Sequence, residues 1–173
     1  MTLTTLKKGD FGSAMLQKIL QLESRSGVKL GFEQKILLAE TGTVEQVLSI
    51  LTDSAVRVKV VKQKENQNTI NRESLITSKD TGRALIRAHS KIFSSCLPPK
   101  VVSKIKQKQA GIGSIIYAFG LETFRKIIEV GYDSKRRLVF RKYQIIYKGR
   151  VAFVIREELL MEGGSSGQGK VAK

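Results

Sequence analysis

The chain has 173 residues, 41% of them hydrophobic and 27% charged, which suits a single soluble domain with a sizeable core. No apolar run approaches the roughly 20 residues that span a bilayer, which predicts no membrane-spanning segment. The N-terminus lacks the features of a signal peptide, and the single cysteine, Cys96, has no partner for an internal disulfide. We therefore expect a cytoplasmic protein.

The formal net charge is +16, from 31 Lys and Arg residues against 15 Asp and Glu residues. Such an excess favours anionic partners, with nucleic acid and small polycarboxylates as the two candidates. The sequence has no aromatic RNA-stacking motif, helix-turn-helix signature or zinc-finger spacing. We therefore interpret most of the charge as a solvated basic surface and expect a small-molecule partner in place of nucleic acid. The charge and the sequence motifs do not indicate an oligomeric state.

Histidine and cysteine are too scarce for most metal or nucleophilic sites. A zinc site would need several carboxylate ligands, because His89 and Cys96 are the only residues of their types. A Ser-His or Cys-His nucleophile would have to use His89, which has no recognisable partner motif nearby. We predict neither a metal centre nor a hydrolytic triad.

Three helices are predicted in the N-terminal part of the chain. The first carries four apolar residues at helical spacing, namely Phe11, Met15, Ile19 and Leu22. The second is a short run at about 32–38. The third begins at Thr43, whose spacing from Gln46 fits a capping box, and continues to Leu51. The segment before it is a simple cap or, alternatively, a place where backbone N–H groups reach a ligand.

The next region is predicted to form strands. Valine alternates with basic residues from 56 to 60, the pattern of a half-buried strand, and a polar loop is predicted at 62–69. A hairpin follows, with arms at 70–77 and 83–90. Arg72 lies on the apolar face of the first arm. The matching face of the second arm has mostly small side chains, which suit either a ligand pocket or close helix packing.

Three further helices are predicted before the last two strands. Prolines at 98 and 99 suit the first turn of one helix, and a short apolar helix follows the Gly111–Gly113 turn. The third helix, at 122–130, places apolar side chains on one side and closes at Gly131. Those apolar residues are Phe124, Ile127 and Ile128.

The chain continues with strands at 138–147 and 151–159. Because side chains alternate across a strand, Glu157 shares one face with Val151, Phe153, Ile155 and Leu159. A lone carboxylate in such an apolar row is costly to bury unless it has a partner or a chemical task. Two interpretations follow. Either burial stops before Glu157, which is then a solvated strand end, or the carboxylate is a buried functional group.

These elements predict an α+β fold, because antiparallel hairpins with interspersed helices replace a strict alternation of strand and helix. We expect a single antiparallel sheet of about six strands with helices packed on one face. The glycine-rich segment at 162–173 is predicted to be a flexible tail.

Four sets of segments resemble those of the chorismate lyase family, in the branch found in archaea and mycobacteria. They are Thr41–Leu48; Asn71–Leu75 with 84–90; Ala110–Gly113 with Thr123–Gly131; and Arg141–Tyr143 with Gly149 and Ile155–Leu160. The resemblance extends over about residues 32–161. It implies a chorismate lyase-like domain there, preceded by an N-terminal helical extension at 1–31.

The resemblance also implies an internal ligand cavity, closed by helical flaps. It implies an enzyme that converts chorismate to 4-hydroxybenzoate and pyruvate without a metal or organic cofactor. The alternative is a non-catalytic domain of the same fold that senses a small aromatic acid. The sequence leaves open whether 4- or 3-hydroxybenzoate forms.

Two catalytic residues are implied by the resemblance. Arg72, at the motif arginine position, would clamp the ring carboxylate of chorismate with its planar fork. Glu157, at the motif glutamate position, would lie at the other end of the ring near the ether oxygen and donate a proton to it. Ile112 and Gly113 would supply a wall and a backbone amide.

Thr43, Val44 and Arg125 complete the binding set that the resemblance implies, with Val44 at an apolar flap position. Arg125 is either a second carboxylate contact or a surface charge on its helix. Glu45 stands where family members often have a small hydroxyl residue. Because an inward-facing carboxylate would repel an anion, we expect Glu45 to face solvent. Arg141 is predicted to form a structural salt bridge.

Overall fold

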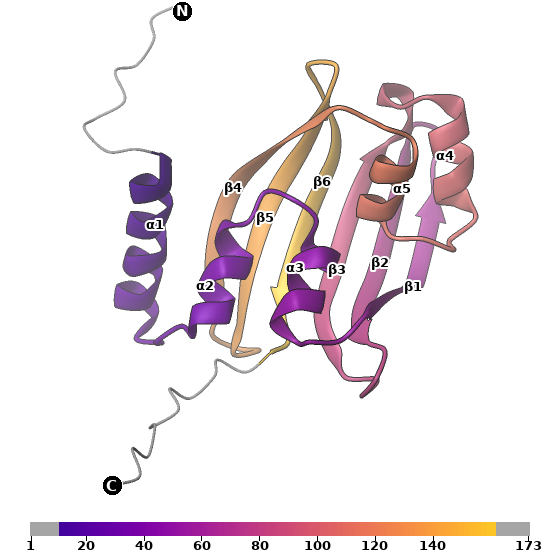
Figure 1. Ribbon diagram of the computed structural model, residues 1–173. Coiled ribbons are helices and arrows are strands. Elements are labelled where there is room, and N and C mark those ends of the chain that lie inside the picture. Colours follow the sequence, from indigo (N-terminus) through magenta and orange to yellow (C-terminus); the bar gives the residue numbers. More distant parts are fainter. Residues whose placement is uncertain (1–10, 162–173) are drawn as a thin grey trace, which may run out of the picture.

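The computed structural model describes residues 11–161 (Figure 1). The predicted tail at 162–173 and the first ten residues of the predicted N-terminal extension lie outside this range, so the structure does not bear on them. No helix within the described range is long and apolar enough to cross a membrane.

One six-stranded antiparallel sheet forms the centre of the molecule, as predicted. Its strands, in chain order, are β1 (Val56–Glu65), β2 (Thr69–Ser78), β3 (Ala84–Phe93), β4 (Thr123–Asp133), β5 (Leu138–Tyr147) and β6 (Arg150–Leu159). In space the order is β1-β2-β3-β6-β5-β4, so the last strand lies in the middle of the sheet between β3 and β5.

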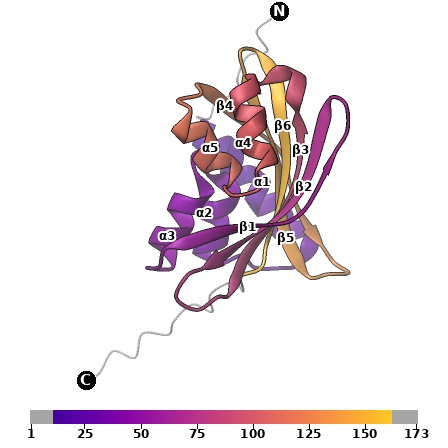
Figure 2. The same cartoon turned by 90° about the vertical axis from the view of Figure 1, so that its right-hand side faces the viewer.

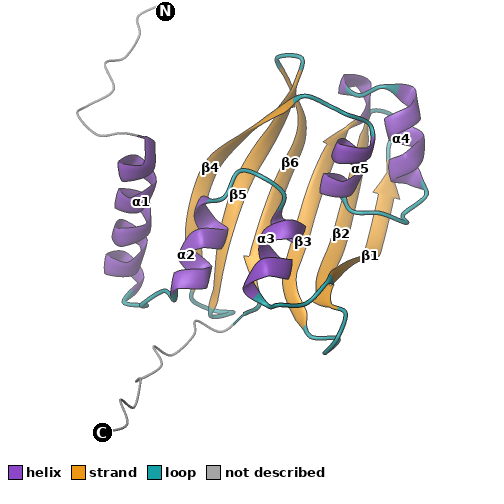
Figure 3. Ribbon diagram, viewed as in Figure 1, coloured by secondary structure: helices purple, strands orange, loops and turns teal. Residues whose placement is uncertain are grey.

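The helices lie on one face of this sheet (Figures 2 and 3). They are α1 (Phe11–Ser26), α2 (Phe32–Ala39), α3 (Val44–Leu51), α4 (Pro99–Lys106) and α5 (Ile112–Ala118), with a 3-10 turn at Ser94–Cys96. α1 stands beside the edge strand β4, whereas α2 and α3 cover one end of the sheet and α4 and α5 the other (Figure 1). The model therefore has the predicted α+β architecture.

The helix-covered face buries two apolar clusters. The first lies under α4 and α5 and includes a row of directly paired strand residues, Ile70, Ile92, Phe153 and Ile145. The second lies under α1, α2 and α3 and includes the row Ile76, Ile86, Leu159 and Val139. Both rows follow from the period of two along each strand, which puts alternate residues on the same face.

Two rows richer in polar side chains separate the apolar clusters, and we call them the polar band. One row pairs Arg72, Ser90, Ile155 and Tyr143, and the other pairs Ser74, Ala88, Glu157 and Arg141. Every strand of the band therefore contributes side chains to the middle of the covered face. The four strands that supply them are β2, β3, β6 and β5.

The opposite face of the sheet carries much of the basic charge. A groove of about 430 Å³ on it has basic lining residues, namely Lys62, Lys64, Arg72, His89, Lys91, Lys142 and Arg156, with Glu73 as the acidic member. Lys142 and Arg156 are direct cross-strand partners. Like charges placed directly opposite each other weaken a sheet, so other contacts must hold these strands together.

The predicted helix at 122–130 is wrong, because this segment is strand β4. The spacing of Phe124, Ile127 and Ile128 fits a helix, but it also fits a strand that contains a bulge. The register with β5 shifts between Ile127 and Glu129, and Phe124 is 63% exposed. Pairing with β5 over the whole segment satisfies the backbone groups, which outweighs a weak local helical pattern.

Two smaller predictions also fail. The predicted loop at 62–69 is mostly strand, since β1 continues to Glu65 and pairs there with β2. The predicted capping box at the start of α3 does not form. Thr43 is the N-cap residue, but its side chain makes no capping hydrogen bond, and its carbonyl oxygen accepts from the N–H of Gln46.

Gly131 does not close a helix; instead it lies directly opposite Phe140 in the β4–β5 pair. A Cβ atom added to Gly131 would lie 2.7 Å from Cε1 of Phe140 and closer still to Cζ. The guanidinium of Arg156 lies 3.4 Å from the centre of the same ring. Glycine at 131 thus leaves the space in which the Phe140 ring packs against the sheet.

We expect Gly131→Ala to lower the free energy of unfolding by about 1–3 kcal/mol, because the added methyl group forces the buried ring to move. Urea denaturation measures the change. The same substitution in a Phe140→Leu background should have a smaller effect, because leucine has no atoms at the ring edge. Equal losses in both backgrounds would show that the glycine is needed for another reason.

Candidate functional site

A small cavity lies between the polar band and the helices α3 and α5. Its volume is about 50 Å³. The strands contribute Val58, Ser74, Ile76, Ala88, Ser90, Arg125, Tyr143, Ile145, Ile155 and Glu157 to its lining, and the helix side contributes Gly42, Val44, Glu45, Gly111, Ile112 and Gly113. Segments from 42 to 157 thus meet at one place, which sequence order alone does not show.

Glu157 is buried in this cavity wall, with 2% of its surface exposed, so the interpretation as a solvated strand end is wrong. Its two oxygens accept hydrogen bonds from different neighbours on β5. Nε of Arg141 donates to Oε2 at 2.7 Å, and the hydroxyl of Tyr143 donates to Oε1 at 2.9 Å. These charge-assisted bonds compensate the cost of removing the carboxylate from water.

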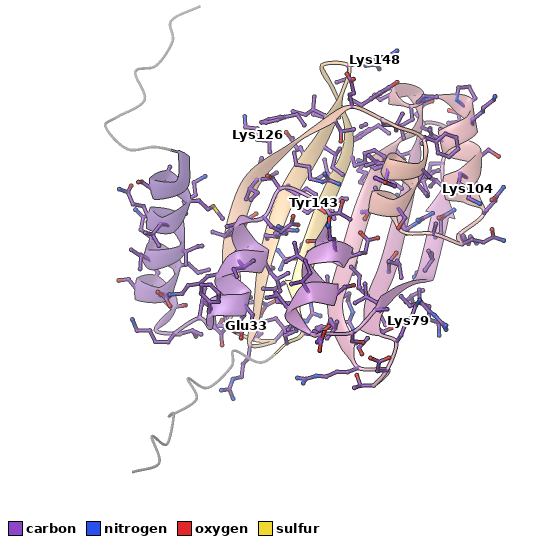
Figure 4. All side chains as sticks on the ribbon, in the orientation of Figure 1. Glu33, Lys79, Lys104, Lys126, Tyr143 and Lys148 are labelled. Atoms are coloured by element: carbon purple, nitrogen blue, oxygen red, sulfur yellow. The ribbon has the colours of Figure 1, made fainter. Side chains whose placement is uncertain are left out.

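Arg141 links Glu157 to a second carboxylate, that of Glu40 at the end of α2. Its guanidinium donates to the carbonyl oxygen of Glu40 at 2.6 Å and also to the Glu40 side chain. The predicted salt bridge of Arg141 is thereby confirmed. Burial, together with the charge of Glu157, raises the pKa of Tyr143 well above its ordinary value, so its hydroxyl keeps its proton. Figure 4 labels Tyr143 near the centre of the molecule.

Arg72 is buried next to the cavity but is not among its lining residues. Nε donates to the side chain of Gln63 at 2.9 Å, Nη1 donates to the carbonyl of Ala110 at 3.1 Å, and Nη2 donates to the carbonyl of Ile105. Arg72 therefore holds the connection between α4 and α5 against the sheet. Burial lowers the pKa of its guanidinium.

The structure brings most of the predicted binding residues together. Ile112, Gly113, Val44 and Arg125 all line the cavity. Arg125 comes from strand β4 instead of the predicted helix, and its Nη1 donates to the carbonyl of Thr41 at 3.3 Å. Thr43 is not among the lining residues and serves as the N-cap of α3.

Glu45 lines the cavity, so the prediction that it faces solvent is wrong. The side chain of Ser114 donates to Oε1 of Glu45 at 3.3 Å, which joins α3 to α5. Burial, and to a smaller extent the charge of Glu157, raises the pKa of Glu45. The prediction considered only repulsion between Glu45 and an anionic ligand. It did not include the contacts of Glu45 with α5.

Sequence reasoning missed Tyr143 and Glu40 as members of the site. The period of two places Tyr143 and Arg141 on one face of β5, a signal that could have paired both residues with Glu157. Glu40 gave no such signal, because its position depends on how the end of α2 meets the sheet. Within residues 11–161, no group of three or more His, Cys, Asp or Glu residues is placed to hold a metal ion.

Sequence comparison relates the chain to known proteins. No family model matches it. Chorismate pyruvate-lyase of Mycobacterium tuberculosis is 25% identical over 162 residues, a match covering 76% of this chain and 81% of the relative. A Methanocaldococcus jannaschii protein named only provisionally as a lyase is 32% identical over 148 residues, covering 76% and 79%. The chain therefore belongs to the family of this archaeal protein, and it is more distantly similar to the mycobacterial chorismate pyruvate-lyase.

Structural comparison supports the fold assignment. PhnF from Mycobacterium smegmatis superimposes with a TM-score of 0.50 at 10% sequence identity, over 70% of this chain. The match spans 64% of PhnF, which is less than two thirds of that chain. At this level of identity the likeness shows a shared fold and carries no information about activity.

Arg72→Lys should lower the free energy of unfolding by about 1–3 kcal/mol, because an ammonium group cannot serve all three acceptors and leaves a buried carbonyl unpaired. Thermal or urea unfolding measures the change. Arg57→Lys, at an exposed position on β1, is the matched control. Equal effects of the two substitutions would contradict the structural role assigned to Arg72.

Glu45→Gln should change how stability depends on pH. A carboxyl group whose pKa is raised in the folded state binds more protons when folded than when unfolded, between its two pKa values. Its stabilising contribution is present at low pH and is lost as the pH rises through the folded-state pKa. The melting temperature of Glu45→Gln minus that of the wild type should therefore increase from pH 4 to pH 8, whereas a pH-independent difference would refute the assignment.

Proposed function

We propose that the chain is a chorismate lyase, which eliminates pyruvate from chorismate to give 4-hydroxybenzoate. The observation that carries the proposal is the buried carboxylate of Glu157, held by Tyr143 and Arg141 in the wall of a cavity between sheet and helices. The name of the mycobacterial relatives supports the same reaction. We also propose that residues 32–161 form the ligand-binding domain, since every lining residue lies within them.

The reaction needs a group that moves one proton. The bond between ring carbon C3 and the enolpyruvyl oxygen breaks, C4 loses its hydrogen as a proton, and the ring becomes aromatic. The departing enolpyruvate takes up one proton and rearranges to pyruvate, so no proton is gained or lost overall. Glu157 is the lining carboxylate that both partners on β5 hold in place, and it would accept the C4 proton and return it to the departing oxygen.

The remaining lining fits the substrate chemistry. Val44, Ile112 and Ile155 would contact the faces of the ring, and Arg125 would pair with a carboxylate. Arg72 has five N–H groups, of which the three acceptors described above engage three. Its other donors would bind the second carboxylate of the substrate while the backbone contacts keep the guanidinium in position. Aromatisation supplies much of the driving force, so positioning and exclusion of water suffice.

Substrate binding requires the cavity to enlarge. A cavity of about 50 Å³ is far smaller than the several hundred Å³ that enclose most small ligands. The helix-side lining comes from α3, from α5 and from the short segments that precede them. We therefore propose that these two helices are the flaps that separate when chorismate binds.

Incubation of the purified protein with chorismate tests the reaction. We expect equal amounts of pyruvate and 4-hydroxybenzoate, and a loss of turnover of about 10²–10⁴-fold in Glu157→Gln, because general acid–base groups contribute this much. Glu129→Gln, an exposed carboxylate on β4, is the matched control and should retain full activity. Chromatography of the products also distinguishes 4- from 3-hydroxybenzoate.

A second variant is needed because Glu157→Gln also breaks a buried ion pair and could lose activity by unfolding. Tyr143→Phe keeps the ring and the Arg141 ion pair and removes only the hydroxyl that donates to Oε1 of Glu157. It should lower kcat and cost about 1–3 kcal/mol of stability, a loss that circular dichroism should show leaves the protein folded. Absence of turnover in the wild type, with 4-hydroxybenzoate bound in an Arg125-dependent way, would overturn the lyase and favour the sensing alternative. Absence of both would overturn both functions.

A further inference from the structure

The carboxylate of Glu45 rests on the Gly111–Gly113 turn. A Cβ atom added to Gly113 would lie 2.6 Å from Oε2 of Glu45, and one added to Gly111 would lie even closer to Oε1. Real Cβ atoms do not approach other atoms this closely, so a side chain at either position would displace the carboxylate. The two glycines and Glu45 therefore fit together as a set, and they come from segments more than 60 residues apart.

No ion pair within residues 11–161 neutralises this carboxylate. The charged groups that face it are Glu157 on β6, which repels it, and Arg125 on β4, which attracts it without a direct contact. Behind Glu157 lie Arg141 and Tyr143, which are already bound to that residue. The other two neighbours, Val58 on β1 and Ser114 on α5, carry no charge.

An anionic ligand in this cavity would face two carboxylates, those of Glu45 and Glu157. Of the two, only Glu157 forms an ion pair, with Arg141, within residues 11–161. At the short distances inside a cavity of this size, a second anion next to the half-buried Glu45 carboxylate is repelled. The same carboxylate also fills space that a ring would need.

We propose that Glu45 is a specificity-determining residue that keeps anionic ligands out of this cavity, and that an aromatic acid enters only when the Glu45 carboxylate is neutral or has left the Gly111–Gly113 turn. This inference rests on the proposed function for the ligand class, aromatic carboxylic acids. It adds that the affinity for such acids falls as the pH rises. The raised pKa of Glu45 agrees with this direction.

Binding of 4-hydroxybenzoate, measured by isothermal titration calorimetry at pH 5 and pH 8, tests the proposal. At pH 8, Glu45→Gln should bind about tenfold more tightly than the wild type, because glutamine keeps the shape and removes the charge. At pH 5 the two proteins should differ less. Glu122→Gln, an exposed carboxylate before β4, is the control and should bind like the wild type at both pH values.

The outcomes separate this inference from the lyase itself. Turnover of chorismate together with equal affinities of wild type and Glu45→Gln at pH 8 would overturn the role of Glu45 and leave the lyase intact. Tighter binding by Glu45→Gln without turnover in any protein would support Glu45 as the determinant and overturn the lyase. No binding by any variant at either pH would overturn both.

A double-mutant cycle tests the contact without a ligand. In the wild type, Gly113→Ala should destabilise the protein because its methyl group expels the Glu45 carboxylate. In a Glu45→Ala background the nearest remaining atom is Cγ2 of Thr43 at 3.3 Å, so the same substitution should cost less or even stabilise α5. An identical effect in both backgrounds would show that Glu45 does not occupy the turn, which overturns the proposal.

Discussion

The burial of the Glu157 carboxylate is the constraint on which the arrangement of the covered face depends. A carboxylate with 2% exposure is tolerable only if fixed donors replace water, and Arg141 and Tyr143 supply them from the neighbouring strand. Burial of the Arg141 guanidinium is in turn compensated by two acceptors at the end of α2, the carbonyl oxygen and the side chain of Glu40. The hairpin of β5 and β6 brings the acid next to its partners, with Arg141 directly opposite Glu157.

The polar band also explains why the helices form two groups. Each apolar cluster is covered by its own set, α1 to α3 on one side and α4 with α5 on the other. The cavity lies where these sets meet, so its lining from the helix side comes from the starts of α3 and α5. Arg72 ties the α4–α5 connection to the sheet at this boundary. The site thus lies at the seam between two packed clusters, and the proposed opening would move α3 and α5, which belong to opposite clusters.

Much of the fold could be predicted from the sequence, because the alternation in β2, β5 and β6 and the turns between strands are strong local signals. β4 could not, since Phe124, Ile127 and Ile128 fit a helix and only the bulge opposite β5 makes them part of a strand. In the site, Glu157 lies at the cavity as the resemblance implied, and Arg125, for which the sequence left two roles open, lies there too. Glu40 and Glu45 depend on how α2 and α3 dock. Docking of helices is a long-range property that residue spacing does not encode.

The groups around the cavity are mainly acidic, whereas the chain as a whole is strongly basic. The net charge of +16 attracts anions to the molecule at long range, and the basic groove on the uncovered face carries part of it. Around the cavity, however, the carboxylates of Glu40, Glu45 and Glu157 outnumber the guanidinium groups of Arg125 and Arg141, while Arg72 is largely occupied by backbone carbonyls. Long-range attraction therefore raises the local concentration of many anions, whereas the proposed role of Glu45 acts only at the cavity. On that proposal, selectivity among anions depends on a short-range exchange at Glu45 and not on the overall field.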